Sequence, residues 1–402
     1  MATPLAHRDA VMPTDASAAV LVGRVLDPEV GPSVVTVRGD TVVDITAAAP
    51  TTSDLLDHSD PVDLARSAAT ERSWSLDDLL ESSLTGDRTR PHLLAPFDLQ
   101  VIKAAGVTFA KSMLERVIEE NAKGDPTRAN DIRQHLSDVV GGAIAQVTPG
   151  TPEAARVKEV LAAEGLWSQY LEVGIGPDPE IFTKAPVLAA VGAGAPIGVL
   201  ERSTWNNPEP EMVLVADAAG RAVAATLGND VNLRDFEGRS ALLLTEAKDN
   251  NASCAVGPFL RLFDDGFTLE DAAGIDVQLT VAGTDGFTLE AVSSVAEMSR
   301  TPTELLEHAW GAHHRYPDGF VLFTGTMFAP TKDRRGPGQG FTHERGDVVT
   351  ISSPKLGMLV NTVDTAEAAP DWTVGIRAFT RNLAARGLLA GETPAAPTTG
   401  IA

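Results

Sequence analysis

Residues Trp205–Pro258 read WNNPEPEMVLVADAAGRAVAATLGNDVNLRDFEGRSALLLTEAKDNNASCAVGP, and this stretch decides the fold and the chemistry expected of the chain. Pro210 fixes its own φ angle and pushes Glu209 towards extended backbone. Because residues two apart in an extended segment point the same way, Glu209 and Glu211 are expected to present their carboxylates on one side. The apolar run Met212–Ala216 continues this segment as a strand that anchors the pair.

A second apolar run, Ala222–Leu227, ends just before Asp230. The turn residues 218–220 join the two runs, which predicts a β-hairpin that returns Asp230 to the neighbourhood of Glu211. Three carboxylates at one place repel each other unless a cation is present, and all-oxygen ligation suits a hard ion such as Mg²⁺, Mn²⁺ or Ca²⁺. The sequence therefore predicts a metal site at Glu209, Glu211 and Asp230. Solvated surface acids are the alternative interpretation, which usually holds for an isolated Glu-x-Glu pair.

The overall composition is that of an ordinary globular protein, with 402 residues, 43% of them hydrophobic and 22% charged. A net charge of −23 disfavours nucleic acid and anionic membrane as partners, and it means that an anionic substrate needs local positive charge from a metal or a lysine. The single cysteine, Cys254, excludes an intrachain disulfide and fits a reducing cytosol, so we expect a cytoplasmic protein. The uncharged run 185–200 is too short and too rich in glycine and proline to span a bilayer.

The N-terminal quarter shows patterns of its own. Short apolar runs around glycine-containing turns predict a small antiparallel sheet, with strands at Ala18–Val22, Ser33–Arg38 and Thr41–Ile45. Capped short helices are predicted at 53–56 and 75–80, where a serine precedes or begins each run. The polar residues 57–73 between them are predicted to form a loop.

Several short motifs of the sequence resemble those of the fumarylacetoacetate hydrolase superfamily. The Glu209-x-Glu211 pair is followed by an apolar strand, by Gly-Asn-Asp-Val-Asn-Leu-Arg-Asp at 228–235, and by Lys248 nine residues before Gly257. Other words that fit are Phe-x-Lys-x-Pro at 182–186, Leu-x-Thr-Gly-Thr at 322–326, and Gly-Asp-x-Val with Gly-x-Leu-x-Asn within 346–361. The resemblance covers roughly residues 93–389 and implies an α+β fold whose mixed sheets form a β-roll catalytic domain.

These patterns together suggest three parts. We expect a small N-terminal α/β accessory domain at residues 1–91 and the metal-dependent catalytic β-roll domain at 92–390. The tail at 391–402, rich in proline, threonine and alanine, is expected to be disordered.

One departure from the family pattern narrows the chemistry. The segment Gly106–Glu115 reads Gly-Val-Thr-Phe-Ala-Lys-Ser-Met-Leu-Glu, where the family has Gly-x-Asn-Tyr-x-x-His-x-x-Glu. Members that cleave C–C bonds use the His–Glu pair to activate water, and Ser112, which replaces the histidine, has no base strength near neutral pH. This argues against an acylpyruvate-type hydrolase and leaves Glu115 as the acid/base candidate. Ser112 and Glu115 also fit a helix capping box, which is the structural alternative for both.

The resemblance implies roles for further residues. Thr326, which follows Gly325, is expected to bind a substrate carboxylate through its hydroxyl and backbone N–H. Lys184 is expected to face the ligand, with a solvated lysine as the alternative. Lys248 is expected to stabilise an enolate oxygen electrostatically.

The words at 166–172, 205–211, 228–240 and 248–254 are closest to the longer bacterial members that dehydrate 2-keto-3-deoxy sugar acids. The resemblance thus implies a lyase of oxidative pentose breakdown, such as xylose degradation, that converts 2-keto-3-deoxy-D-xylonate (2-dehydro-3-deoxy-D-arabinonate) to 2,5-dioxopentanoate. It also implies Mg²⁺ or Mn²⁺ as cofactor and a homodimer or homotetramer. A C–C hydrolase or 2-oxo acid decarboxylase on the same metal site, and a non-catalytic sugar-acid binding protein, are the alternatives.

Overall fold

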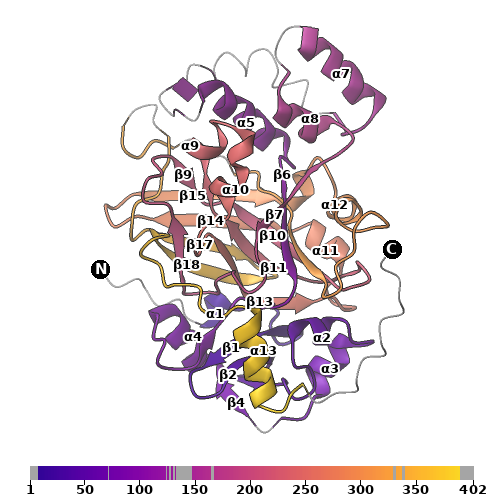
Figure 1. The fold of residues 1–402 in the computed structure, drawn as a ribbon, viewed down its shortest axis with the longest axis vertical. Coiled ribbons are helices and arrows are strands. Elements are labelled where there is room, and N and C mark those ends of the chain that lie inside the picture. Colours follow the sequence, from indigo (N-terminus) through magenta and orange to yellow (C-terminus); the bar gives the residue numbers. More distant parts are fainter. Residues whose placement is uncertain are drawn as a thin grey trace.

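The structure is a computed structural model, and it describes residues 8–70, 72–123, 125, 128–129, 132, 147–163, 167–328, 332–336 and 340–389. Two β-sheets pack against each other at the centre of the molecule, and helices cover the ends and sides (Figure 1). Both sheets contain antiparallel and parallel strand pairs. This arrangement confirms the predicted α+β class with mixed sheets.

The larger sheet supplies the strands that carry the predicted metal site. In spatial order it comprises β4 (Ser73–Ser75), β3 (Thr41–Asp44), β2 (Gly31–Arg38), β1 (Leu21–Asp27), β13 (Cys254–Leu262), β11 (Ala222–Asp230), β10 (Pro210–Ala216), β16 (Phe320–Phe323), β6 (Val101–Gly106) and β7 (Glu180–Ala185), and β5 (His92–Leu93) also pairs with β1. Every residue of β10 and β13 is buried. These central strands are therefore covered on both faces, which holds their side chains in fixed positions.

The smaller sheet covers one face of the larger one. Its spatial order is β15 (Thr288–Ser294), β14 (Asp276–Ala282), β17 (Val348–Ser353), β18 (Gly357–Thr365) and β8 (Pro196–Val199). Along β14, buried Val277, Leu279 and Val281 alternate with more exposed residues, as expected for a strand with one face in the core. Strands β14, β17 and β18 lie against β10, β11 and β13 of the larger sheet.

The N-terminal strands extend the larger sheet. Strand β1 pairs antiparallel with β13, so β1 to β4 continue the same hydrogen-bonded ladder. Near the C-terminus, α13 (Ile376–Ala385) packs on β2, where Asn382 and Arg386 donate hydrogen bonds to the carbonyls of Val30 and Pro32. The division into domains at residue 91 stays a prediction, and the sheet crosses it. The tail predicted at 391–402 lies outside the described residues.

The short N-terminal helices test the capping predictions. Helix α4 (Leu76–Thr85) begins after the predicted cap Ser75, whose hydroxyl accepts from the Asp78 backbone. Helix α2 (Thr52–Leu56) begins after Thr51, and not at Ser53, because Thr51 and Asp54 form a capping box. The predicted loop at 57–73 was wrong: it contains α3 (Pro61–Ser67), whose first turn combines an Asp60 cap with a proline.

A helical cap lies at the end of the molecule opposite to the N-terminal strands (Figure 1). It consists of α5 (Ala110–Ala122), α7 (Pro152–Ala163) and α8 (Gln169–Ile175), with a small core of its own around Met113, Ile118, Tyr170 and Leu171. Near it lie β9 (Asn206–Asn207), α9 (Arg234–Glu237) and α10 (Leu244–Lys248). Strand β12 (Asn232–Leu233) pairs with β9, and η1 (Ala241–Leu243) contacts α9 and α10. The other elements are α1 (Arg8–Val11), α11 (Leu269–Ala273), η2 (Val295–Glu297) and α12 (Pro302–Ala309).

Within the described part of the chain, no helix combines the length and the apolar character that a membrane crossing requires.

Candidate active site

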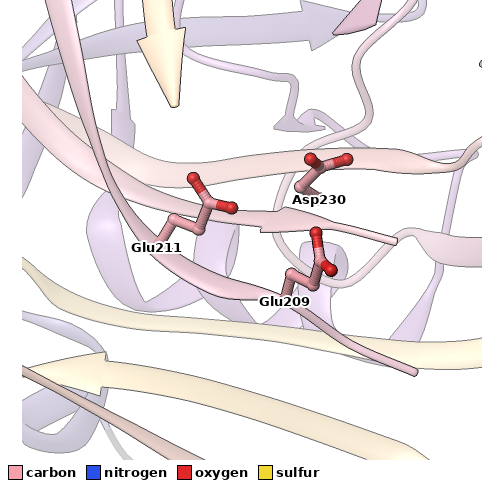
Figure 2. A group of neighbouring side chains, drawn as sticks. All are labelled: Glu209, Glu211 and Asp230. Atoms are coloured by element: carbon pink, nitrogen blue, oxygen red, sulfur yellow. The ribbon is translucent and has the colours of Figure 1, made fainter. Parts of the chain in front are cut away.

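Three buried carboxylates meet where the predicted hairpin ends. Strands β10 and β11 pair antiparallel with Glu211 opposite Gly228, and the backbone N–H of Asp230 donates to the carbonyl of Glu209 at 3.0 Å. Oxygen atoms of Glu209, Glu211 and Asp230 all lie within 4.8 Å of one another, and each residue is at most 4% exposed. Figure 2 shows the three carboxylates turned towards one another. The tertiary structure thus brings the three residues together as the sequence predicted.

Gly325 holds one of these carboxylates from the neighbouring strand. Its backbone N–H donates to Oε2 of Glu211 at 2.6 Å, from the turn that follows β16. Gly325 has a φ of +94°, and a Cβ at this position would come within 2.0 Å of the hydroxyl oxygen of Thr108. The position therefore requires glycine both for its backbone conformation and for space.

Two buried lysines hold the other two carboxylates. The ammonium of Lys248 lies 2.9 Å from Oδ2 of Asp230 and also contacts Glu209. Lys184 lies 2.8 Å from Oδ1 of Asp230, and it donates to the carbonyls of Val231 and Lys248. Although burial opposes ionisation, these lysines keep the pKa of Asp230 below its usual value. Asp230 is therefore ionised and fixed from two sides.

The electrostatics of the group call for a cation. Burial raises the pKa of Glu211 well above its usual range, and the charges of Asp230 and Glu209 raise it further. The protonated form of Glu211 is therefore favoured in the metal-free protein. A divalent cation would replace that proton and offset the repulsion among the three groups, and an all-oxygen donor set suits a hard ion such as Mg²⁺ or Mn²⁺.

A cavity lies above the three carboxylates, and most of the predicted site residues line it. Its wall includes Ser112, Glu115, Lys248, Gly325 and Thr326 as well as the three carboxylates. Among the described residues, the wall does not include Lys184, which is fully buried behind Asp230. The structure therefore gives Lys184 a supporting position under the carboxylates, and contact with a ligand stays a prediction.

The capping box, the structural alternative for Ser112 and Glu115, does not form. Helix α5 begins after Phe109, without a side-chain cap, so Ser112 lies inside its first turn. The Ser112 hydroxyl donates to the carbonyl of Phe109 at 3.0 Å. The Glu115 carboxylate lies 3.6 Å from a guanidinium nitrogen of Arg234. This alternative was wrong because the helix starts at Ala110, two residues before Ser112, and both side chains line the cavity wall.

A network of buried arginines and glutamates surrounds the site, and it was not predicted from the sequence. Arg116 contacts Glu119 at 2.7 Å, Glu237 at 2.6 Å and Glu209 at 2.5 Å. Arg234 binds Glu119 at 2.6 Å from the other side. The Arg116–Glu119 spacing of three residues on one helix was a local signal, but the partners 93 and 121 residues away could not be read from the sequence.

Glu180 is a further candidate functional residue, and it was not singled out from the sequence. It begins strand β7 and lines the cavity. Burial raises its pKa to about 7, and the negative charge of Glu237 adds to the shift. A carboxyl group with such a pKa exchanges protons readily near neutral pH. A signal lay in the Phe-x-Lys-x-Pro motif, because strand alternation places Glu180 on the same face as Phe182, which also lines the cavity.

Comparison with known proteins gives matches over much of the chain. A family model described as "Fumarylacetoacetate (FAA) hydrolase C-terminal" matches residues 157–364. The chain is 32% identical over 221 residues to a probable 2-keto-3-deoxyxylonate dehydratase of Haloferax volcanii, covering 55% of this chain and 71% of that protein. It is 31% identical over 185 residues to the 2-dehydro-3-deoxy-D-arabinonate dehydratase of Saccharolobus solfataricus, covering 46% of this chain and 58% of that protein.

Solved structures also share the architecture. The chain is similar to 2-keto-3-deoxy-D-arabinonate dehydratase in an apo form, with a TM-score of 0.60, and in a complex with magnesium and 2,5-dioxopentanoate, with a TM-score of 0.59. Each match covers 86% of this chain and 99% of the other, at 20% sequence identity. At this level of identity the likeness concerns the fold.

Proposed function

The chain belongs to the fumarylacetoacetate hydrolase family, and we propose that it is a metal-dependent dehydratase that converts 2-keto-3-deoxy-D-xylonate (2-dehydro-3-deoxy-D-arabinonate) to 2,5-dioxopentanoate and water. The fold of this family, predicted from the sequence, is confirmed. The observation that carries the proposal is one cavity that joins a buried carboxylate triad, a glutamate with a pKa of about 7, and a serine in place of a basic residue.

We infer that Glu209, Glu211 and Asp230 hold Mg²⁺ or Mn²⁺. The donor set and the raised pKa of Glu211 fit such an ion, and the name of a similar solved structure includes magnesium. When bound, the ion would act as a Lewis acid towards the carboxylate and ketone of a 2-oxo acid and would acidify the C3 protons.

The residues around the triad would place the substrate. Thr326 lines the cavity beside Gly325, and its hydroxyl already accepts a hydrogen bond from the Phe328 backbone, so its own proton is directed elsewhere. We assign it to the substrate carboxylate. Lys248 uses two of its three N–H groups on Glu209 and Asp230, and the third would stabilise negative charge on the C2 oxygen.

The two glutamates at the wall would move the protons. We assign Glu180 as the base that takes the C3 proton, because its pKa of about 7 suits both accepting and releasing a proton near neutral pH. We assign Glu115 to the C4 hydroxyl, which leaves as water after it receives a proton. Loss of a C5 proton then gives a dienol, and tautomerisation of this dienol yields 2,5-dioxopentanoate.

The position of Ser112 favours elimination over hydrolysis. C–C hydrolysis on such a site requires a base that activates water, and the Ser112 hydroxyl cannot act as one. The Ser112 hydroxyl donates its proton in a hydrogen bond to the Phe109 carbonyl. This contact supports a reaction that needs no attacking water.

Turnover and product analysis test the proposal. The purified protein with Mg²⁺ should consume 2-keto-3-deoxy-D-xylonate and produce 2,5-dioxopentanoate, which a semialdehyde dehydrogenase couples to NAD(P)H formation. Carbon-13 NMR should show the five-carbon skeleton intact, and EDTA should abolish turnover. A shortened skeleton would establish the hydrolase or decarboxylase alternative, and binding without turnover would establish a binding protein.

We further propose a homodimer or homotetramer that acts in the cytoplasm in pentose catabolism. A 2-oxo sugar acid would be its small-molecule partner, as the names of the relatives suggest. Light scattering of the purified protein tests the assembly, and a mass of one chain would overturn that part of the proposal.

A further inference from the structure

The ladder that carries the metal ligands continues one step past them. Glu211 pairs with Gly228 in β10 and β11. Asn207 pairs with Asn232 in the separate two-stranded sheet of β9 and β12, with the same register offset. Glu209 therefore lies opposite Asp230, and Asn207 lies opposite Asn232 on the next rung of the same face. A rung of amides thus follows the rung of carboxylates, at about 7 Å along the strand.

Both amide side chains have a hydrogen-bonded NH₂ group and an unpaired oxygen. Asn207 donates its NH₂ group to the carbonyl of Pro208 at 2.8 Å, and Asn232 donates its NH₂ group to Glu237 at 2.8 Å. These acceptors fix which end of each amide is nitrogen. The Oδ1 atoms of both side chains are buried and have no hydrogen-bond partner among the described residues. A buried acceptor without a donor costs free energy, so it calls for a ligand or water that supplies the missing hydrogen.

Asn207 is the member of the pair that reaches the cavity. It is only 2% exposed, yet it lines the same cavity as the carboxylate triad. Its NH₂ group gives one N–H to Pro208, and its unpaired Oδ1 is the acceptor that it can offer to a ligand. Its natural ligand is therefore a group that carries a hydrogen, and in a sugar acid that group is a hydroxyl.

The direction of the substrate follows from the same ladder and rests on the proposed function. The carboxylate end is assigned to Thr326, which lies beside Glu211 because Gly325 binds that residue. The remaining carbon atoms of the substrate would then extend past Glu209 towards Asn207. Beyond the C2 ketone the substrate has C3, C4, C5 and the C5 oxygen. At about 1.5 Å per bond, these atoms span roughly the distance between the rung of Glu209 and the rung of Asn207.

We propose that Oδ1 of Asn207 accepts a hydrogen bond from the C5 hydroxyl of the substrate and so selects for 2-oxo acids with a terminal hydroxymethyl group. The C4 hydroxyl leaves as water and needs a proton donor, which Asn207 cannot be. The C5 oxygen stays on the carbon skeleton and becomes the aldehyde oxygen of the product, so the C5 hydroxyl needs no proton donor, and the Oδ1 acceptor suits it. A substrate that ends in a methyl group leaves the amide oxygen unpaired, which penalises its binding.

The test compares two substrates that differ only in this hydroxyl. Wild type, Asn207→Leu and Thr326→Val are assayed with 4,5-dihydroxy-2-oxopentanoate and with 4-hydroxy-2-oxopentanoate in the presence of Mg²⁺, by NMR of substrate loss. Asn207→Leu is close in size and lacks the acceptor. We expect it to lower kcat/KM for the dihydroxy acid by about tenfold or more, and that for the 4-hydroxy acid by less than about twofold. Thr326→Val should lower both by a similar factor.

Equal losses for the two acids in Asn207→Leu, or no loss, would overturn the assignment, as would a loss explained by weaker Mg²⁺ binding in calorimetry. If Asn207→Leu does not fold, Asn207→Ala is used, and equal kcat/KM for both acids in wild type also overturns the assignment. If wild type turns over neither acid, the proposed dehydratase function fails. The dissociation constants of the two acids, measured by calorimetry with Mg²⁺, then still decide whether Asn207 senses the C5 hydroxyl.

Discussion

The backbone N–H of Gly325 donates a hydrogen bond of 2.6 Å to Oε2 of Glu211. This bond joins two residues that are 114 positions apart in the chain, and it orients a proposed metal ligand from outside the hairpin that carries it. Partners of this kind, which bind the ligands of a metal, commonly govern affinity for the ion. The Gly325–Glu211 contact therefore links the Leu-x-Thr-Gly-Thr motif at 322–326 directly to the Glu-x-Glu motif at 209–211.

We expect Gly325→Ala to weaken Mg²⁺ or Mn²⁺ binding by about 10- to 100-fold, because a Cβ would collide with Thr108 and displace the N–H from Glu211. Isothermal titration calorimetry of the metal measures this. Gly286→Ala is the control, since Gly286 also has a positive φ but has nothing within 4 Å of its Cβ position. Equal metal affinities in the two variants would contradict the prediction.

Metal binding should release a proton and should strengthen as the pH rises. Burial raises the pKa of Glu211 in the metal-free protein, so the metal must compete with a proton for this carboxylate. Lower pH favours the protonated form and weakens binding, while higher pH favours the carboxylate and strengthens it. Calorimetry in buffers of different ionisation enthalpy counts the released protons. A dissociation constant independent of pH would argue against the proposed role of Glu211.

The rate of the reaction should depend on a group that ionises near neutral pH. If Glu180 is the base, it must be deprotonated, so kcat/KM should rise with pH and level off above about 7. A bound cation favours the carboxylate and would move the inflection somewhat lower. Glu180→Gln should lose about 10²- to 10⁴-fold in kcat and the inflection with it. A variant that keeps both the rate and the pH profile would exclude Glu180 as the base.

Glu115→Gln is expected to lower kcat by about 10²- to 10⁴-fold and to leave metal affinity intact, because Glu115 lines the cavity but is not one of the three clustered carboxylates. It should also retain the pH inflection assigned to Glu180, which separates the two roles. Steady-state kinetics over a pH series measures both effects. Near wild-type turnover would contradict the acid role and leave Glu115 with a structural role, such as its contact with Arg234.

Lys184→Met should destabilise the metal-free protein by about 3–5 kcal/mol, because it leaves Asp230 buried without one of its two lysine partners. Urea denaturation monitored by tryptophan fluorescence measures the loss. Lys103→Met on the neighbouring strand β6 is the matched control, since Lys103 is only partly buried and hydrogen-bonds the hydroxyl of Thr183. A similar stability for both variants would show that Lys184 contributes little to the site.

The hairpin of the metal site was predictable because its determinants are local. Two apolar runs, a glycine turn and a Glu-Pro-Glu word set the pairing of β10 with β11, and the side-chain alternation of a strand does the rest. The start of α5 was not predictable in the same way. Ser112 and Glu115 fit a capping box by spacing, but the chain enters the helix three residues earlier, after Phe109. Phe109 is 1% exposed, so tertiary burial overrides the local capping signal.

The sequence by itself determined the family, the mixed α+β fold, and the identity and convergence of three carboxylates, because each of these depends on spacing within short segments. Only the tertiary structure decided the ionisation of those groups and their partners. Lys184 reaches Asp230 across 46 residues and Arg116 reaches Glu209 across 93, and burial then raises the pKa of Glu180 and Glu211. Coulombic interaction and desolvation act through space, so they depend on which distant segments the fold brings together.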